Sequence, residues 1–231
     1  KACEVLETPV TGGNVSFYNE DTDQKRAVYP TVVVGMVGLI EDIQHITTSW
    51  FKAEGDLIVL LGKNKYSEGV SATGGAELGG SEYLKVIHNL VKGKPPQIDL
   101  NFEKRVQSTC LEAIQAGIIK SAHDCSEGGL AIALAECCIT NPERTFGAKI
   151  NLTNKIRTDA VLFGETQSRI LVSLSPNSLK KLEKIAKKYK VPIEIIGEVT
   201  SDRLIINDWI DVASEQLKDL YYNAIGNLMG D

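Results

Sequence analysis

The segment that opens with His123 holds residue types suited to a phosphorylated ligand and a metal ion. It reads His123-Asp-Cys-Ser-Glu-Gly-Gly-Leu130 and directly precedes an apolar run that predicts a buried helix. Asp124 offers a hard oxygen ligand for Mg²⁺. Ser126 and the two glycines would let backbone N–H groups approach an anion at the positive end of the helix dipole. A plain helix start, with Ser126 as the N-cap and Asp124 as a turn acid, fits equally well.

A second polar turn runs from Thr11 to Glu20, with the sequence Thr-Gly-Gly-Asn-Val-Ser-Phe-Tyr-Asn-Glu. Its glycines, among them Gly13, permit close backbone approach, and Asn14 offers a neutral oxygen to a metal or phosphate network. Ser16 follows two residues later, on the same side of an extended strand. A Gly-Asn hairpin turn explains the same residues, and spacing alone favours that simpler interpretation.

Two further polar clusters contain glycine, at residues 73–82 and at Phe163-Gly-Glu-Thr-Gln-Ser-Arg169. Each of them, taken singly, fits a loop that binds nothing. No Walker A motif is present, because Gly62-Lys63 and Gly93-Lys94 are followed by Asn64 and Pro95. Four such clusters in one chain favour a phosphate and metal site more strongly than any one of them does.

The composition limits the class of protein. The chain has 231 residues, 43% of them hydrophobic and 24% charged, with a formal net charge of -5. These values are typical of a globular chain of one large or two smaller domains. The negative charge argues against non-specific nucleic-acid binding. No apolar run reaches the roughly 18 residues that cross a bilayer, so we expect no membrane partner. The lysines of residues 180–190 predict a solvated helix face.

The cysteines indicate the compartment. Their number, five, is odd and no CxxC pair occurs, which is typical of reduced thiols in a cytoplasmic protein. The chain starts Lys-Ala-Cys-Glu-Val, which is neither a signal peptide nor an initiating methionine. We therefore expect a piece of a longer protein.

The strongest strand signal in the first quarter of the chain lies at residues 31–40. This run is uncharged and rich in β-branched residues, which predicts a strand buried on both faces. So little preceding sequence could hardly cover it, and the cover would then come from missing sequence or from a partner subunit. A homodimer of the chain is one such arrangement. A polar turn at residues 53–56 marks a domain boundary.

Beyond that boundary strands alternate with helices, which predicts an α/β or α+β fold with a mixed sheet. Residues 203–207 are expected to form a hairpin with the strand before them. The other elements expected are strands at 57–61, 169–174 and 193–199, and helices at 103–120, 130–139, 177–190 and 213–229.

Taken in order, the clusters at 11–20, 78–84, 123–130 and 163–169 resemble the C-terminal part of the phosphoribosylformylglycinamidine synthase family. This family is part of the aminoimidazole ribonucleotide synthetase-like superfamily, and the resemblance covers essentially the whole chain. It implies a mixed β-sheet covered by helices, with residues 55–231 as the second C-type domain. Residues 1–54 would then be the end of the second N-type, ATP-binding domain.

The resemblance implies an ATP-dependent ligase of purine biosynthesis. The family phosphorylates the formamide oxygen of formylglycinamide ribonucleotide, and ammonia displaces the phosphate to leave an amidine. The cofactors implied are ATP and Mg²⁺. By resemblance Gly13 contacts ATP, Asn14 binds Mg²⁺ and Ser16 contacts the substrate. Asp124 and Ser126 match an auxiliary site that holds Mg²⁺ and nucleotide.

The resemblance assigns a substrate role to Glu165 and Gln167 as well, through the internal duplication of the family. The catalytic histidine of the family belongs to the missing N-terminal half, so no catalytic residue is expected here and His123 is a structural neighbour. The partners implied are that N-terminal half, a glutaminase subunit, a small third subunit and formylglycinamide ribonucleotide. Two alternatives stay open: a structural half with an auxiliary nucleotide site, and a kinase-like relative from the same superfamily.

Overall fold

The computed structural model describes residues 1–16, 19–29, 31–62, 77–153 and 156–230. It divides into two compact units, residues 1–46 and residues 47–231, which are described separately. The cluster at 73–82 is described only from residue 77, and residues 17 and 18 of the first polar turn lie outside the described ranges. The assignment of residues 1–54 and 55–231 to two domain types stays a prediction.

The first unit contains little regular structure in its described part. Its elements are α1 (Ala2–Leu6), β1 (Glu20–Asp21), β2 (Arg26–Ala27) and the short 3-10 helix η1 (Ile43–His45). The strand predicted at 31–40 is wrong, because these residues form no regular element and are exposed, Val37 to 98%. A strand needs a hydrogen-bonded neighbour and a covering layer. Within the described part of this unit, β1 and β2 pair with each other and with nothing else.

The second unit is built on a seven-stranded sheet in the order β4-β6-β3-β7-β5-β8-β9. Neighbouring strands are antiparallel except β5 and β8, which are parallel. The sheet is therefore mixed, as the sequence predicts. The strands are β3 (Leu57–Gly62), β4 (Ser121–Asp124), β5 (Gly147–Ile150), β6 (Arg169–Leu174), β7 (Ile193–Thr200), β8 (Arg203–Ile206) and β9 (Ile210–Ala213).

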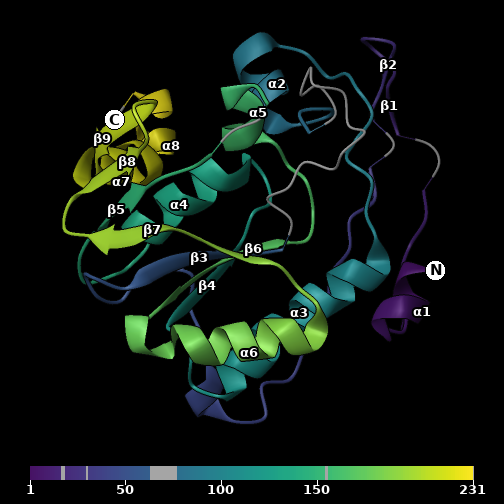
Figure 1. Ribbon diagram of the computed structural model, residues 1–231. Helices are drawn as coiled ribbons and strands as arrows, with labels where there is room; N and C mark the ends of the chain where they lie inside the picture. The colour runs from purple at the N-terminus through teal and green to yellow at the C-terminus, as the bar shows by residue number, and fades with distance from the viewer. Residues whose placement is uncertain (17–18, 30, 63–76, 154–155, 231) are drawn as a thin grey trace. The chain divides into compact units, whose positions relative to one another are not determined.

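Helices cover both faces of this sheet (Figure 1). The side chains of interior strand β3 point alternately to the two faces: Ile58 and Leu60 pack in the core with α4, and Val59 and Leu61 pack in the core with α3 and α6. The predicted helices are confirmed, with ends shifted by a few residues and with the tail broken at Asn223. The helices are α2 (Glu82–His88), α3 (Leu100–Gln115), α4 (Gly129–Ile139), α5 (Thr158–Phe163), η2 (Pro176–Ser178), α6 (Leu179–Tyr189), α7 (Ser214–Tyr222) and α8 (Ala224–Met229).

The hairpin predicted between β7 and the strand at 203–207 is wrong. Strand β5 lies between them, antiparallel to β7 and parallel to β8. Gly147 at the start of β5 makes this arrangement sterically feasible, because a Cβ there would lie 2.5 Å from the backbone N and O atoms of Arg203. The chain leaving β7 therefore crosses directly over the first residue of β5.

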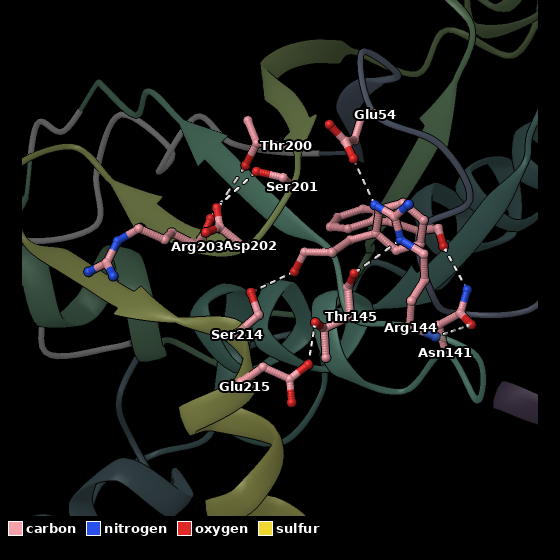
Figure 2. A network of polar contacts seen from close by, with 12 residues as sticks. Glu54, Asn141, Arg144, Thr145, Thr200, Ser201, Asp202, Arg203, Ser214 and Glu215 are labelled. Carbon is pink, nitrogen blue, oxygen red and sulfur yellow. Dashed lines mark hydrogen bonds and ion pairs between the residues drawn. The ribbon is translucent and has the colours of Figure 1, made fainter.

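Polar contacts fasten the segment before β3 to the rest of the second unit (Figure 2). The guanidinium of Arg144 donates to Glu54 at 2.7 Å and stacks 4.2 Å from the ring centre of Phe146. The hydroxyl of Ser214, at the start of α7, donates to the carbonyl of Phe146 at 2.6 Å. Residues 47–54 thus pack with the residues that follow them.

Among the described residues, no helix combines the length and the apolar character needed to cross a bilayer.

Candidate functional site

The loop between β4 and α4 places Asp124 and Ser126 side by side. The hydroxyl of Ser126 donates to the carboxylate of Asp124, whose side chain is 69% exposed. The N-cap of α4 is Gly128, in the left-handed conformation and without a side-chain cap, so the interpretation of Ser126 as the N-cap is wrong. The two predicted ligand-binding side chains therefore face solvent together at the end of an edge strand.

His123 occupies both of its ring nitrogens with neighbours. Its Nδ1 lies 2.8 Å from the Asp124 carbonyl oxygen, and its Nε2 lies 2.8 Å from Oε2 of Glu136 on α4. The Asp124 side chain, with Glu136 as a further contributor, raises the pKa of His123 against the opposing effect of burial. In return, His123 and then Ser126 hold the pKa of Asp124 well below its usual value. His123 joins the loop to α4, and Asp124 stays ionised at neutral pH.

These shifts give a prediction for stability against pH. A raised pKa means that the His123 contacts stabilise the fold fully below the unfolded pKa of about 6.5, and that this contribution is lost as pH rises through the folded pKa. We therefore expect the melting temperature of His123→Gln to change less between roughly pH 6 and pH 9 than that of the parent chain. Parallel thermal melts across that range check this, and superimposable profiles would contradict it.

The same logic applies to Asp124 with the opposite sign. Its lowered pKa stabilises the fold above about pH 4, and this contribution disappears as pH falls through the folded pKa. Acid melts of Asp124→Asn serve as the control, since that variant lacks the titrating group. Because Asp124 is also the main cause of the raised pKa of His123, Asp124→Asn should flatten the profile at both ends, whereas His123→Gln leaves a titrating Asp124 at the acidic end.

Glu165 lies at the N-terminus of α4. Its Oε1 accepts the N–H of Gly128 at 2.9 Å and the N–H of Glu82, the first residue of α2, also at 2.9 Å. Gly129 has a φ of 67°, and a Cβ there would lie 2.5 Å from the carbonyl oxygen of Gly164. Gly129 therefore allows α4 to pack closely against the end of α5, which the sequence interpretation did not foresee.

Gln167 links the loop before β6 to the loop before α3. Its Nε2 donates to the carbonyl of Pro96 at 3.2 Å, and its Oε1 is buried without a hydrogen-bond partner. Oε2 of Glu77 and Oγ1 of Thr166 are buried and unpartnered as well. The structure thus brings Glu165 to the α4 loop and leaves the Gln167 amide oxygen buried without a hydrogen-bond partner.

The first unit holds the remaining predicted residues. Asn14 Nδ2 donates to Ser16 Oγ at 3.3 Å, and both residues are exposed. Nothing lies within 4 Å of a Cβ placed on Gly13. Residues 11–16 form no strand, so the Gly-Asn hairpin turn is absent from this described stretch. Among all described residues, no group of three or more His, Cys, Asp or Glu side chains gathers as a metal site.

Comparisons with known proteins agree with the fold. Residues 53–208 match the family described as AIR synthase related protein, C-terminal domain. The phosphoribosylformylglycinamidine synthase subunit PurL of Thermoanaerobacter sp. (strain X514) is 48% identical over 97% of this chain. The PurL of Nostoc sp. (strain PCC 7120) is 42% identical over 97% of it. The chain spans 29% of the length of each of these relatives.

A solved structure shows the same fold at lower identity. T. maritima PurL complexed with FGAR matches with a TM-score of 0.61 and 21% identity, over 76% of this chain and 30% of that one. The family match covers more than half of the chain and includes every described strand of the seven-stranded sheet except β9. The chain therefore belongs to the AIR synthase related family and carries its C-terminal domain.

Proposed function

We propose that this chain is the C-terminal part of the ATP-dependent synthetase subunit of phosphoribosylformylglycinamidine synthase. The reaction would convert formylglycinamide ribonucleotide, ATP and glutamine-derived ammonia to formylglycinamidine ribonucleotide. The observation that carries the proposal is the 48% identity to a PurL subunit over 97% of the chain. Residues 1–54 would contribute the end of the second N-type domain and residues 55–231 the second C-type domain.

Asp124 and Ser126 would form the protein side of an auxiliary Mg²⁺ and nucleotide site. Mg²⁺ in nucleotide sites is usually held by one or two carboxylates together with phosphates and waters. An exposed, ionised carboxylate with a hydroxyl bonded to it fits that requirement without a larger acidic cluster. When bound, the metal ion would neutralise phosphate charge. Asp124 and Ser126 would position it at the end of β4.

The polar turn of the first unit would serve the main active site. Gly13 would approach ATP with its backbone, Asn14 would bind Mg²⁺ and Ser16 would contact the substrate. The hydrogen bond between Asn14 and Ser16 supports this, because it aligns two polar side chains on one exposed turn. Gln167 would contribute a substrate contact that the internal duplication suggests, whereas the Glu165 carboxylate is already bonded to the backbone of Gly128 and Glu82. The catalytic histidine would come from the N-terminal half.

The proposed partners are that N-terminal half, a glutaminase subunit and a small third subunit, in the cytoplasm. All five cysteines are free thiols and four of them are buried, which supports a reducing compartment. The exposed apolar residues at 31–40 support an interface with the missing half or with a second copy of the chain. A purely structural half is the second candidate function, since Glu165 already fills the N-terminus of α4. Upstream sequence with a single N-type domain would instead favour a kinase-like relative.

Calorimetric titration of Mg-ATP tests the auxiliary site. We expect the chain to bind Mg-ATP and Asp124→Ala to bind at least about tenfold more weakly, because a contact to a charged group is lost. Glu127→Ala, an exposed acid in the same loop, is the matched control and should bind as the parent does. Asn14→Ala reports whether the first unit contributes to binding.

The two functional candidates give different results. Loss of binding in Asp124→Ala alone would support a self-contained auxiliary site. Absence of binding in every version would show that nucleotide recognition needs the missing half, and would leave this chain as a structural part. The ligase assignment itself is tested by mixing the chain with the separately produced N-terminal part of a PurL relative. We expect amidine formation from the mixture and none from either part alone.

A further inference from the structure

The carboxylate of Glu165 occupies the position that an anion would take at the N-terminus of α4. Its Oε1 lies 2.9 Å from the Gly128 nitrogen, and the adjacent Gly129 N–H donates to the carbonyl of Ser126 at 3.0 Å. Both N–H groups of the glycine pair are therefore used within the chain. Helix α4 has eleven residues, and its dipole favours a negative charge at this end.

The backbone on both sides of Glu165 is held in place. The N–H of Glu165 donates to the carbonyl of Glu77 at 3.0 Å. The guanidinium of Arg169, itself buried, donates to the carbonyls of Gly164 and Thr166. The residues before and after Glu165 are thus fixed by one arginine, and the carboxylate is presented to α4 by a preorganised loop.

A contact from a second helix strengthens the same arrangement. The N–H of Glu82 donates to the same Oε1 at 2.9 Å, and Tyr83 of α2 stacks on Phe163 of α5 with ring centres 4.8 Å apart. One carboxylate oxygen therefore joins α2 and α4, next to the stacked pair that joins α2 and α5. Displacing it would leave two backbone N–H groups without a partner at once.

We propose that the Glu165 carboxylate takes the place of a bound anion at the N-terminus of α4. It occupies the position beside the Gly128 N–H that a ligand phosphate would otherwise take. It thereby directs any nucleotide to the side of the loop where Asp124 and Ser126 are exposed. Glu165 is then a positioning residue rather than a substrate contact. The statement about nucleotides rests on the function proposed above, whereas the statement that Glu165 occupies the anion position at α4 does not.

Inorganic phosphate and acetate test the occupancy directly. In Glu165→Ala the two N–H groups become available, so we expect this variant to bind inorganic phosphate about tenfold more tightly than the parent chain, the order of one hydrogen bond to a charged group. Acetate, which restores the missing carboxylate, should raise the melting temperature of Glu165→Ala more than chloride at equal ionic strength does. Glu127→Ala, which removes the same charge from the exposed loop, should behave as the parent in both assays.

The Glu165→Gln variant distinguishes the loss of the acceptor oxygen from the loss of the negative charge. Its amide oxygen still accepts both N–H groups, so we expect neither the gain in phosphate binding nor the acetate effect. An identical response of Glu165→Ala and the parent to both anions would overturn the proposal, as would a gain in Glu165→Gln equal to that in Glu165→Ala. If Glu165→Ala does not fold in chloride, folding in acetate supports the proposal and failure in both contradicts it. The phosphate and acetate measurements still test the proposal if no version binds Mg-ATP. That result would count against the auxiliary site alone.

Discussion

We expect Gly129→Ala to destabilise the second unit by about 3–5 kcal/mol, because two penalties add. The residue has a φ of 67°, which a side chain rarely adopts. The new Cβ would also lie 2.5 Å from the carbonyl oxygen of Gly164, 2.9 Å from the carbonyl carbon of Phe163 and 3.0 Å from the carbonyl oxygen of Leu162. These atoms belong to the backbone at the end of α5, so α4 and α5 must move apart. Equilibrium denaturation in urea measures the loss.

Gly117→Ala is the matched control for this substitution. Gly117 has nearly the same φ, 65°, but a Cβ there meets nothing within 4 Å. It should therefore cost about 1 kcal/mol, the conformational penalty alone. Equal losses for the two variants would show that close packing of α4 against α5 is not what requires glycine at position 129.

The second large effect concerns the ion pair between Asp56 and Lys120. Asp56 is 3% exposed, and its Oδ1 accepts from Lys120 Nζ at 2.6 Å, whereas its Oδ2 is buried without a partner. The pair bridges the starts of β3 and β4, on either side of β6. Lys120→Met removes the cation and leaves a buried carboxylate uncompensated, which we expect to cost about 3 kcal/mol.

Two controls give this prediction its meaning. The double variant Asp56→Asn with Lys120→Met removes both charges and should recover part of the loss, since the buried charge is gone. Lys85→Met breaks the exposed pair with Glu82, at 3.0 Å, and should cost less than about 0.5 kcal/mol. Urea denaturation of all three variants decides the matter. A loss for Lys120→Met as small as that for Lys85→Met would contradict it.

Local patterns predicted the elements better than their neighbours in the sheet. Helix α4 follows from the apolar run that ends at Ile139, and helix α6 follows from its lysines on one side and apolar residues on the other. Each pattern lies within a single helix, and both helices form where the sequence predicts them. The position of β8 in the sheet depends on its neighbour β5, a four-residue strand without a distinctive pattern. The sequence therefore does not predict where β8 lies. The run at 31–40 has high strand propensity, but propensity without a neighbouring strand does not make a sheet.

The site divides in the same way. Asp124 and Ser126 are two residues apart, so their contact follows from the loop itself. The role of Glu165 depends on Gly128 and Glu82, which are 37 and 83 residues away in the sequence. No spacing rule connects such positions. The only local signal was an acidic residue directly after Gly164, where α5 ends.

The strand order also determines when the sheet can form during synthesis. Strand β3 is made early, but both of its neighbours, β6 and β7, come from residues 169–200. At roughly 10 residues per second, about ten seconds pass before the first neighbour emerges from the ribosome. Until then, an apolar strand with two open edges is exposed, the kind of segment that aggregates or recruits chaperones. Translation speed between β3 and β6 should therefore affect the yield of folded protein.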